Sequence, residues 1–314
     1  MNVAVRPLQE HDLSEAERIF RLAFGTFLGL PDPLSFMGDA DLVASRWRTD
    51  PAAAFGAYAP DGSLVGSTFT TNWGSFGFFG PLTVRPDLWD QGIAQKLLAA
   101  NIALFERWGS RQVGLFTFPD SPKHLALYQK FGFWPQYLTS VMAKPVGPSA
   151  GVGGWSTYSG LPPDTRETSL AQCRRLTNAV DSGLDLSCEI QAVAAQQLGD
   201  TVLVHDDTEL VGFAICHVGK GSEAGSGAAY VKFGAARPGV QAARDFTRLL
   251  QACEDYAWAR GVAKLMAGVS TARHAACQMM LERGYRTALL GVAMQRPNQP
   301  GHNRPDCFVI DDWR

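Results

Sequence analysis

Hydrophobic and polar positions follow two periods along the chain, and each period predicts a different element. Alternating or continuous apolar runs predict strands in the first half at residues 3–8, 76–84, 112–118 and 136–145, with a hairpin over 53–71. Apolar residues three and four positions apart predict helices at residues 10–24, about 39–48, 94–108 and 121–132. Strands and helices therefore alternate, as is typical of an α/β protein.

The second half of the chain repeats this order of elements. Helices are predicted at residues 168–180, 187–198, 241–261 and 272–284, a hairpin over 201–218, and strands at 228–236, 263–270 and 287–297. The ends of corresponding segments also match: Trp108 with Trp258, and Gly132-Phe133 with Gly284-Tyr285. The shared order and these paired ends indicate an internal duplication.

A stretch rich in Pro, Gly and Ser, KPVGPSAGVGG, lies between the two halves. It lacks any apolar period and has the composition of a linker. We therefore predict a first domain over residues 1–145, a linker over 146–154, a second domain over 155–297 and a tail over 298–314.

Charge and composition narrow the function classes. The chain of 314 residues has 28 Lys and Arg against 30 Asp and Glu, a net charge of −2, with the charges interspersed. This balance argues against a nucleic-acid platform or a polybasic membrane binder. No stretch approaches the ~20 apolar residues of a membrane span, and the beginning of the chain lacks the apolar run of a signal peptide. We expect a cytoplasmic protein.

The six cysteines all lie after residue 170, and none has the spacing of a zinc site. We expect them to be reduced and mostly buried, and we expect no metal in this protein.

The segment VRPDLWDQGIAQKLL, Val84 to Leu98, connects a predicted strand to a predicted helix. Gly92 and Ala94 stand at the point where the helix begins. Small residues there permit a tight turn, and they also let an anion approach the unpaired N–H groups at the positive end of the helix. The turn alone does not decide between these two roles.

Two motifs together resemble the GCN5-related N-acetyltransferase (GNAT) family. The family's loop has the pattern Val-x-Pro, a short spacer and then Gly-x-Gly/Ala, and here Val84, Pro86, Gly92 and Ala94 match it. The second motif, HLALYQKFGF, places Tyr128 shortly before Gly132-Phe133. The resemblance implies an α/β fold with an α+β mixed sheet, built from two tandem acyl-CoA N-acyltransferase (GNAT) domains.

The resemblance also implies acetyl-CoA as co-substrate. The backbone of the loop would hold the pyrophosphate, the end of the preceding strand would pair with the pantetheine arm, and one N–H of that strand would polarise the acetyl carbonyl. The implied binding residues are Leu82, Thr83, Val84, Trp89, Asp90, Gln91, Gly92, Ile93, Ala94, Gln95, Lys96, Ser121 and Lys123.

Tyr128 would be the general acid that returns a proton to the departing thiolate, since a phenol and a thiol have similar basicity. The sequence does not identify the general base, because the strand GSFGFFGPLTV has no carboxylate where many family members have Glu. Asp120, His124 or a bound water remain as candidates. The chain also departs from the family pattern at two positions. Trp89 stands at the first position of the loop, where Arg or Gln is usual, and Ser121 stands where Asn is usual.

The second half lacks this machinery. Its corresponding segment, GAARPGVQAARDF, has no Gly-x-small pair at the right spacing, and Met280 stands where Tyr128 stands in the first half. A methionine cannot donate a proton. We therefore expect a degenerate second GNAT-like domain that shapes the acceptor cleft or the surface of a homodimer.

The leading hypothesis is an N-acetyltransferase that moves an acetyl group by direct transfer from acetyl-CoA to a small-molecule primary amine, with the N-terminal half active. It needs neither nucleic acid nor membrane as a partner. Two alternatives stay open. A non-catalytic acyl-CoA sensor is motivated by the missing strand carboxylate, and an aminoacyl-tRNA-dependent transferase by the tandem fold, although the balanced charge argues against it. The identity of the acceptor and the oligomeric state do not follow from the sequence.

Overall fold

The computed structural model describes residues 2–148, 154–207 and 209–314, and within them thirteen strands form one mixed sheet. The first half contains β1 (Ala4–Pro7), α1 (Leu13–Phe27), α2 (Val43–Thr49), β2 (Ala54–Tyr58), β3 (Leu64–Trp73), β4 (Phe76–Val84), α3 (Ile93–Trp108), β5 (Gln112–Thr117), α4 (Pro122–Gln129) and β6 (Trp134–Pro145). The second half contains β7 (Trp155–Thr157), α5 (Pro163–Val180), α6 (Ser187–Ala195), β8 (Gly199–Asp206), β9 (Glu209–Gly219), β10 (Gly225–Ala236), α7 (Ala242–Ala259), β11 (Lys264–Ser270), α8 (His274–Glu282), β12 (Arg286–Arg296) and β13 (Val309–Asp311). The predicted α/β class with a mixed sheet is confirmed.

The element boundaries differ from the prediction where side chains cap a helix. The predicted helix over 39–48 begins only at Val43, because the Asp41 carboxylate accepts a hydrogen bond from Ala44 N at 2.8 Å and so starts the helix there. The strands β7 and β13 were not predicted, since each has only three residues and too short a pattern to show a period.

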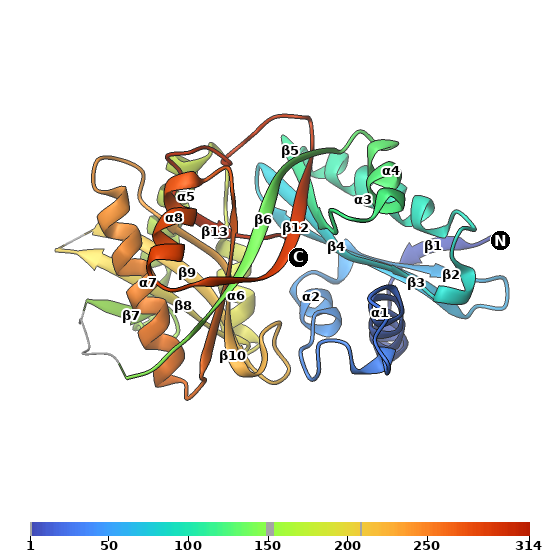
Figure 1. The fold of residues 1–314 in the computed structure, drawn as a ribbon, viewed down its shortest axis with the longest axis horizontal. Coiled ribbons are helices and arrows are strands. Elements are labelled where there is room, and N and C mark those ends of the chain that lie inside the picture. The colour runs from blue at the N-terminus through green and yellow to red at the C-terminus, as the bar shows by residue number, and fades with distance from the viewer. Residues whose placement is uncertain (1, 149–153, 208) are drawn as a thin grey trace.

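The two halves exchange their last strands. The sheet order is β1-β2-β3-β4-β5-β12-β6-β11-β10-β9-β8-β7, with β13 beside β10. Strand β12, from the second half of the chain, therefore pairs with β5 of the first half, while β6 pairs with β11. Figure 1 shows β6 and β12 side by side where the halves meet. The sheet thus runs unbroken from one half to the other; residues 149–153 of the predicted linker lie outside the described residues.

Helices cover both faces of the first half. Helices α1 and α2 lie on one side of the sheet, and α3 and α4 lie on the other (Figure 1). The inward stripe of α1 is formed by Ala16, Ile19, Phe20 and Ala23, which are buried. This packing places α1 against one side of β4 and α3 against the other.

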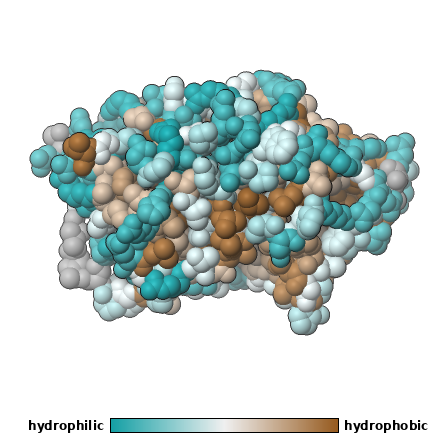
Figure 2. All heavy atoms as spheres, turned by 45° about the horizontal axis from the view of Figure 1, so that its top comes forward, coloured by the Kyte–Doolittle hydropathy of each residue, from teal (hydrophilic) through white to brown (hydrophobic). Residues whose placement is uncertain are grey.

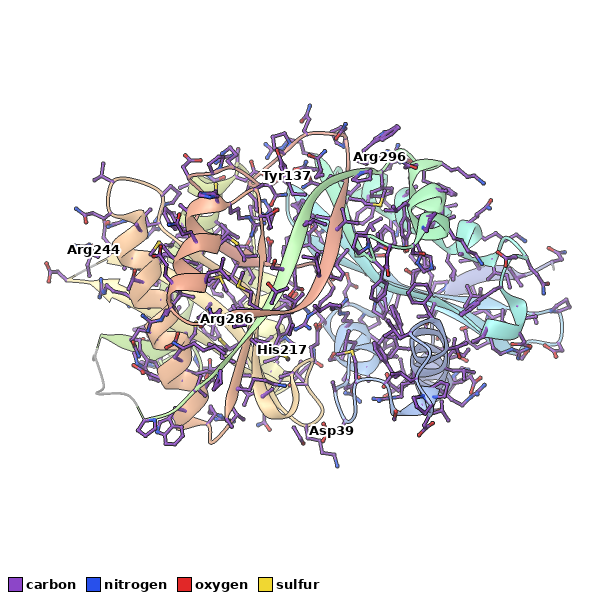
Figure 3. The ribbon with its side chains drawn as sticks, in the orientation of Figure 1. Asp39, Tyr137, His217, Arg244, Arg286 and Arg296 are labelled. Atoms are coloured by element: carbon purple, nitrogen blue, oxygen red, sulfur yellow. The ribbon has the colours of Figure 1, made fainter. Side chains whose placement is uncertain are left out.

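A shared core joins the halves. Trp73 at the end of β3 lies 4.8 Å from the Phe78 ring of the same half and 5.4 Å from the Phe233 ring of β10. Asp39 also bridges the halves, accepting hydrogen bonds from Ser226 N at 2.8 Å and Ser226 Oγ at 2.5 Å (Figure 3). These contacts fix the halves against each other.

A buried ionic network reinforces the same junction. Arg46 of α2 pairs with Glu223 at 2.8 Å, and Lys232 of β10 contacts Glu223 at 2.8 Å and Glu189 of α6 at 2.9 Å. Burial by itself raises the pKa of Glu223, but the cations Arg46 and Lys232 outweigh it and hold that pKa well below its ordinary value. The carboxylate is therefore charged and paired, which makes removal of any one partner costly.

Large apolar side chains are exposed on β6 and β12, among them Tyr137, Leu289 and Leu290. Figure 2 shows apolar residues gathered near the middle of one face, with hydrophilic residues around them. In the described part of the chain, the helices are all too short or too polar to traverse a bilayer. Nor do those residues bring together three or more His, Cys, Asp or Glu side chains that could hold a metal ion.

Candidate active site

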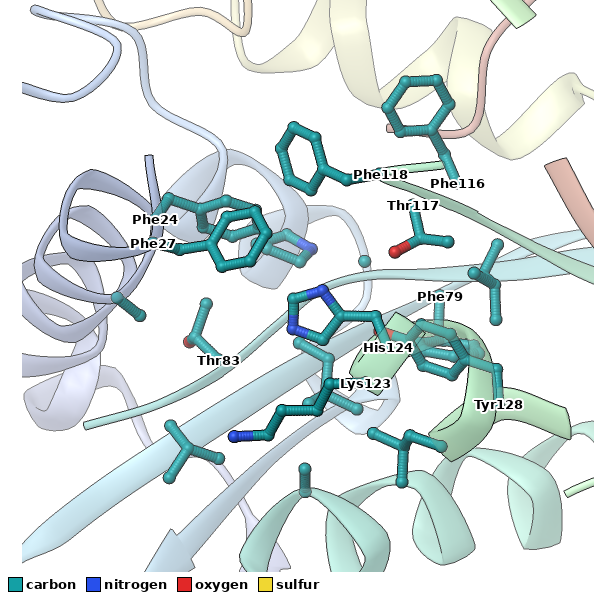
Figure 4. A pocket seen from close by; sticks show the side chains of 18 of the residues that line it. Phe24, Phe27, Phe79, Thr83, Phe116, Thr117, Phe118, Lys123, His124 and Tyr128 are labelled. Atoms are coloured by element: carbon teal, nitrogen blue, oxygen red, sulfur yellow. The ribbon is translucent and has the colours of Figure 1, made fainter. Parts of the chain in front are cut away.

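A cavity of about 680 Å³ opens in the first half between α1, β4, β5 and α4. Its walls carry most of the residues that the sequence singled out. Figure 4 shows Phe24 and Phe27 of α1 facing Phe118, His124 and Tyr128 across this space.

The cavity exists because β4 and β5 separate. The two strands are paired in parallel only from Phe76 to Phe78 of β4, so from Phe79 onward β4 has no strand on that side within the described residues. A bulge in the β3–β4 register follows Phe79, and Arg46 Nη1 donates to Gly80 O at 2.5 Å beside it. The free edge leaves backbone N–H and C=O groups to pair with an extended ligand.

The turn after β4 leads to the N-terminus of α3 and is left-handed at two residues, Asp90 with φ 65° and Gly92 with φ 78°. A Cβ on Gly92 would meet no atom within 4 Å, so the space beside this residue is open. Among the described residues no protein group accepts from the N–H groups of Gly92, Ile93, Ala94 or Gln95. The helix therefore presents unpaired donors and its positive end to the cavity.

Most of the predicted acetyl-CoA residues line this cavity: Leu82, Thr83, Val84, Trp89, Asp90, Gly92, Ile93, Ala94, Gln95 and Lys123. Three do not: Gln91, Lys96 and Ser121. Lys96 Nζ points elsewhere and donates to Val3 O at 3.2 Å. Ser121 is buried at the beginning of α4.

Trp89 and Lys123 close one side of the turn. The indole Nε1 of Trp89 donates to Val84 O at 2.8 Å, which holds the ring against the end of β4. Lys123 Nζ lies 5.7 Å from the Trp89 ring centre and pairs with Asp90 at 2.6 Å. This exposed pair adds little stability but keeps a cation beside the turn that leads to α3.

Tyr128 lies on α4 with its ring 5.9 Å from that of Phe79, and only 8% of its surface is exposed. Burial raises the pKa of Tyr128 to about 12. Tyr128 lines the cavity, and the described residues show no hydrogen bond from its hydroxyl to the protein. A neutral phenol that faces the cavity without a protein acceptor can give its proton to a ligand.

The two candidate bases are placed differently. Asp120 is exposed and does not line the cavity. His124 does line it, with its ring 4.9 Å from Phe27 and with Nδ1 buried and unpaired in the described structure. Burial, and to a smaller degree the Lys123 charge, lower the pKa of His124, so its ring is neutral at pH 7.

The sequence analysis missed part of the wall. Leu289 of β12 and the residues after β13, Trp313 and Arg314, line the cavity although they come from the second half of the chain. The Trp313 ring packs 4.7 Å from that of Phe76. No local pattern signals this, because the contact depends on the strand exchange and on the path of the tail.

The equivalent place in the second half is filled by the protein itself. Strand β10 pairs in parallel with β11 only from Ala228 to Val231, and beyond that point β13 pairs with β10 from Phe233 to Ala235. The tail segment thus lies where β4 has a free edge. The loop to the next helix is also shorter, residues 237–241 against residues 85–92 in the first half.

Two further differences follow at the same place. The Asp245 carboxylate lies fully buried in the first turn of α7, with Arg244 at 3.1 Å, so an internal anion occupies the positive end of that helix. Met280 is buried in the core of the second half.

Comparison with known proteins agrees with this geometry. Residues 18–133 match the model of the acetyltransferase (GNAT) family. The chain carries a GNAT acetyltransferase domain. Enzymes of this family are N-acetyltransferases that use acetyl-CoA. No curated protein sequence matches the chain significantly.

Solved GNAT-type structures match the chain over nearly its whole length. A putative acetyltransferase from Pyrococcus horikoshii is 15% identical with a TM-score of 0.69, covering 99% of this chain and 95% of its own. A GCN5-related N-acetyltransferase from Sphaerobacter thermophilus is 15% identical with a TM-score of 0.58, covering 95% and 96%. A third, from Anabaena variabilis, is 12% identical with a TM-score of 0.55, covering 94% and 72%. At these identities the likeness establishes the fold, and the predicted tandem arrangement of GNAT domains is confirmed at that level.

Proposed function

We propose that the first half, residues 1–145, is the working N-acetyltransferase and transfers an acetyl group from acetyl-CoA directly to a small-molecule primary amine. The observation that carries this proposal is the conjunction of a free β4 edge, unpaired N–H groups at the start of α3 and the Tyr128 hydroxyl in one cavity. Acetyl-CoA supplies an activated thioester.

The residues present fit that co-substrate. The N–H groups of Gly92 to Gln95 suit a pyrophosphate, and the open space at Gly92 leaves room for it. The free edge of β4 at Leu82–Val84 suits the amide groups of the pantetheine arm. Tyr128 holds a proton at Oη for the thiolate, and His124 is the base candidate on the cavity wall. Gln91, Lys96 and Ser121 stay proposed contacts of lesser weight, since they lie off the wall.

The second half, residues 155–297, is proposed to be a degenerate domain that supports the first. The segment β13 along β10, the short loop and the buried Asp245 all favour this assignment, because each fills or removes a part that the first half keeps open. The tail, residues 298–314, then belongs structurally to both halves.

Calorimetric titration with acetyl-CoA tests the proposal through its stoichiometry. We expect one site per chain, lost in Gly92→Glu, because the new side chain strains a left-handed backbone and puts a carboxylate beside the phosphates. Gly62→Glu is the matched control, since Gly62 is also left-handed, φ 87°, with open space around it in the β2–β3 turn. Two sites per chain would show that the second half also binds, and no heat at all would exclude the transferase.

A non-catalytic acyl-CoA sensor is the second candidate, favoured by the absence of a carboxylate from β4, FGFFGPLTV. It predicts one acetyl-CoA site per chain without consumption of the acetyl group over a broad panel of amines. Turnover with any amine excludes it.

A further inference from the structure

The wall of the cavity beyond the reacting end is aromatic and continuous. The ring of Phe24 stacks on Phe36 at 5.3 Å and lies 6.3 Å from Phe118. Phe118 in turn lies 5.1 Å from Phe27, and Phe27 lies 4.9 Å from His124. These side chains join α1 to the β5–α4 connection, and Figure 4 shows Phe24, Phe27, Phe118 and His124 facing one space. An acceptor there meets flat apolar surfaces.

The charged side chains of the cavity wall also bear on which acceptor the cavity can bind. Asp90 is the one carboxylate among the described residues that line the cavity, and it lies in the turn before α3, already paired with Lys123. The other ionised side chains of the wall are cations: Lys123, Lys130 and Arg314, of which Arg314 pairs with the buried Asp312 at 3.4 Å. Among the described side chains of the wall, an ammonium group would find no unpaired carboxylate.

Proton balance points the same way. In acetyl transfer a C–N bond replaces the thioester C–S bond, the amine nitrogen loses one proton, and the departing thiolate gains one from Tyr128. A neutral amine therefore needs only to pass one proton to His124 or to water. An alkylammonium, with a pKa near that of lysine, must first lose an extra proton, and at pH 7 only about one molecule in a thousand has done so. The one carboxylate side chain among the described wall residues, Asp90, is already paired with Lys123.

We propose that the acceptor is a primary aromatic amine, whose nitrogen is attached to the ring and is uncharged at pH 7. This inference rests on the proposed function and narrows its substrate class. The rings of Phe24, Phe27 and Phe118 hold the aromatic body, and the lack of an unpaired carboxylate side chain on the described wall disfavours cationic amines.

The test compares matched acceptors on the whole protein. We expect kcat/KM at pH 7 to be at least about tenfold higher for 4-chloroaniline than for 4-chlorobenzylamine or spermidine, given the neutral fraction of each. We also expect 4-chloroaniline, and not the benzylamine, to give a saturable heat when titrated into protein already bound to CoA. The benzylamine rate should rise with pH by up to about tenfold per unit, while the aniline rate stays flat from pH 7 to 9.

A carboxylate placed in the wall should reverse the preference. Phe27 is 37% exposed, so Phe27→Glu can fold, and it puts an anion beside His124. We expect this variant to lose aniline turnover and to gain benzylamine turnover by about tenfold. Leu34→Glu is the control, because Leu34 is 47% exposed and does not line the cavity.

The outcomes of these experiments distinguish failure of the aromatic-amine acceptor from failure of the proposed acetyl transfer. Preference for benzylamine or spermidine, or no change of preference in Phe27→Glu, would overturn the aromatic-amine acceptor and leave acetyl transfer standing. Acetyl-CoA binding with no amine accepted would overturn it too and would favour the sensor. Absence of acetyl-CoA binding would remove the proposed function itself.

Discussion

At the scale of single residues, the proposed chemistry depends on one phenol, Tyr128, in an apolar setting. Tyr128 is flanked by Phe79 and raised in pKa by burial, so it stays protonated over the whole range in which proteins of this kind are assayed. Burial also lowers the pKa of His124, which lies on the same helix. Burial thus keeps both groups neutral, which suits one as proton donor and the other as acceptor.

Replacing Tyr128 by Phe should lower kcat by about 10- to 10⁴-fold and leave acetyl-CoA affinity within about twofold, because only the proton donor is removed. Initial rates and calorimetry check this, with Tyr137→Phe as control, since Tyr137 lies exposed on β6 and outside the cavity (Figure 3). A raised pKa moves deprotonation upward, so no loss of rate from Tyr128 is expected below pH 10, its ordinary pKa. Unchanged turnover in the variant would remove Tyr128 from the mechanism.

How far the sequence predicts individual site residues depends on whether a local pattern carries them. Gly92 and Tyr128 were found because each sits at a fixed place in a short motif, and both line the cavity. Trp313 and Arg314 could not be found, since they reach the wall through strands far apart in the sequence. Asp120 is a candidate base from the sequence, but in the structure it is exposed and lies off the cavity wall.

At the scale of elements, the second half of the chain contributes to the candidate active site through β12. That strand takes the place beside β5, with Val292 opposite Thr117. A Cβ on Gly291 would lie 2.0 Å from the ring of Phe116, so only glycine lets this ring keep its position on the cavity wall. Phe116 is therefore positioned by a residue from the other half.

Gly291→Val should displace the Phe116 ring and reduce kcat/KM for the acceptor by about ten- to a hundredfold, as small misplacements at a reacting centre do. Overpacking should also lower the free energy of unfolding by about 1–3 kcal/mol. Acetyl-CoA affinity should change less than twofold, since the α3 turn is untouched. Kinetics, thermal unfolding and calorimetry check these values against Gly147→Ala, whose added Cβ meets open space. An unaltered kcat/KM would mean that Phe116 takes no part in acceptor binding.

Elements with a long apolar pattern are predicted well from the sequence, and short elements are predicted poorly. The strand over 76–84 has the bounds of β4, because its apolar run is unbroken and ends at a turn. The start of α2 shifted, since a capping carboxylate outweighed the apolar pattern there. The sequence places β13 in a tail, although its three residues pair with β10 beyond the point where β10 and β11 separate.

At the scale of the whole molecule, the exchange of β6 and β12 makes the two halves one folding unit. Each half supplies a strand that the other half's sheet needs, and Arg46, Glu223 and Lys232 add a buried ionic link. The order of elements along the sequence predicts two domains, but pairing between strands more than 100 residues apart leaves no local signal in the sequence.

A chain divided between residues 148 and 154 tests this unit. Expressed alone, residues 1–148 and 154–314 should each aggregate, because β5 and β11 would keep exposed edges. Expressed together, they should copurify and show a single unfolding transition by circular dichroism and tryptophan fluorescence. An intact chain cleaved in the linker after folding is the control and should stay associated. A soluble, active first half on its own would contradict the prediction.

The strand exchange also determines when the first half can complete its sheet during synthesis. As the chain emerges, β5 is complete by Thr117 but waits for its neighbour β12, which ends at Arg296, so the first half cannot close its sheet until nearly all of the protein has been made. Phe116 and Leu289 then reach their places on the cavity wall at the same late moment. We therefore expect a product that stops short of β12 to carry Gly92 and Tyr128 and still lack the complete cavity wall and acetyl-transfer activity.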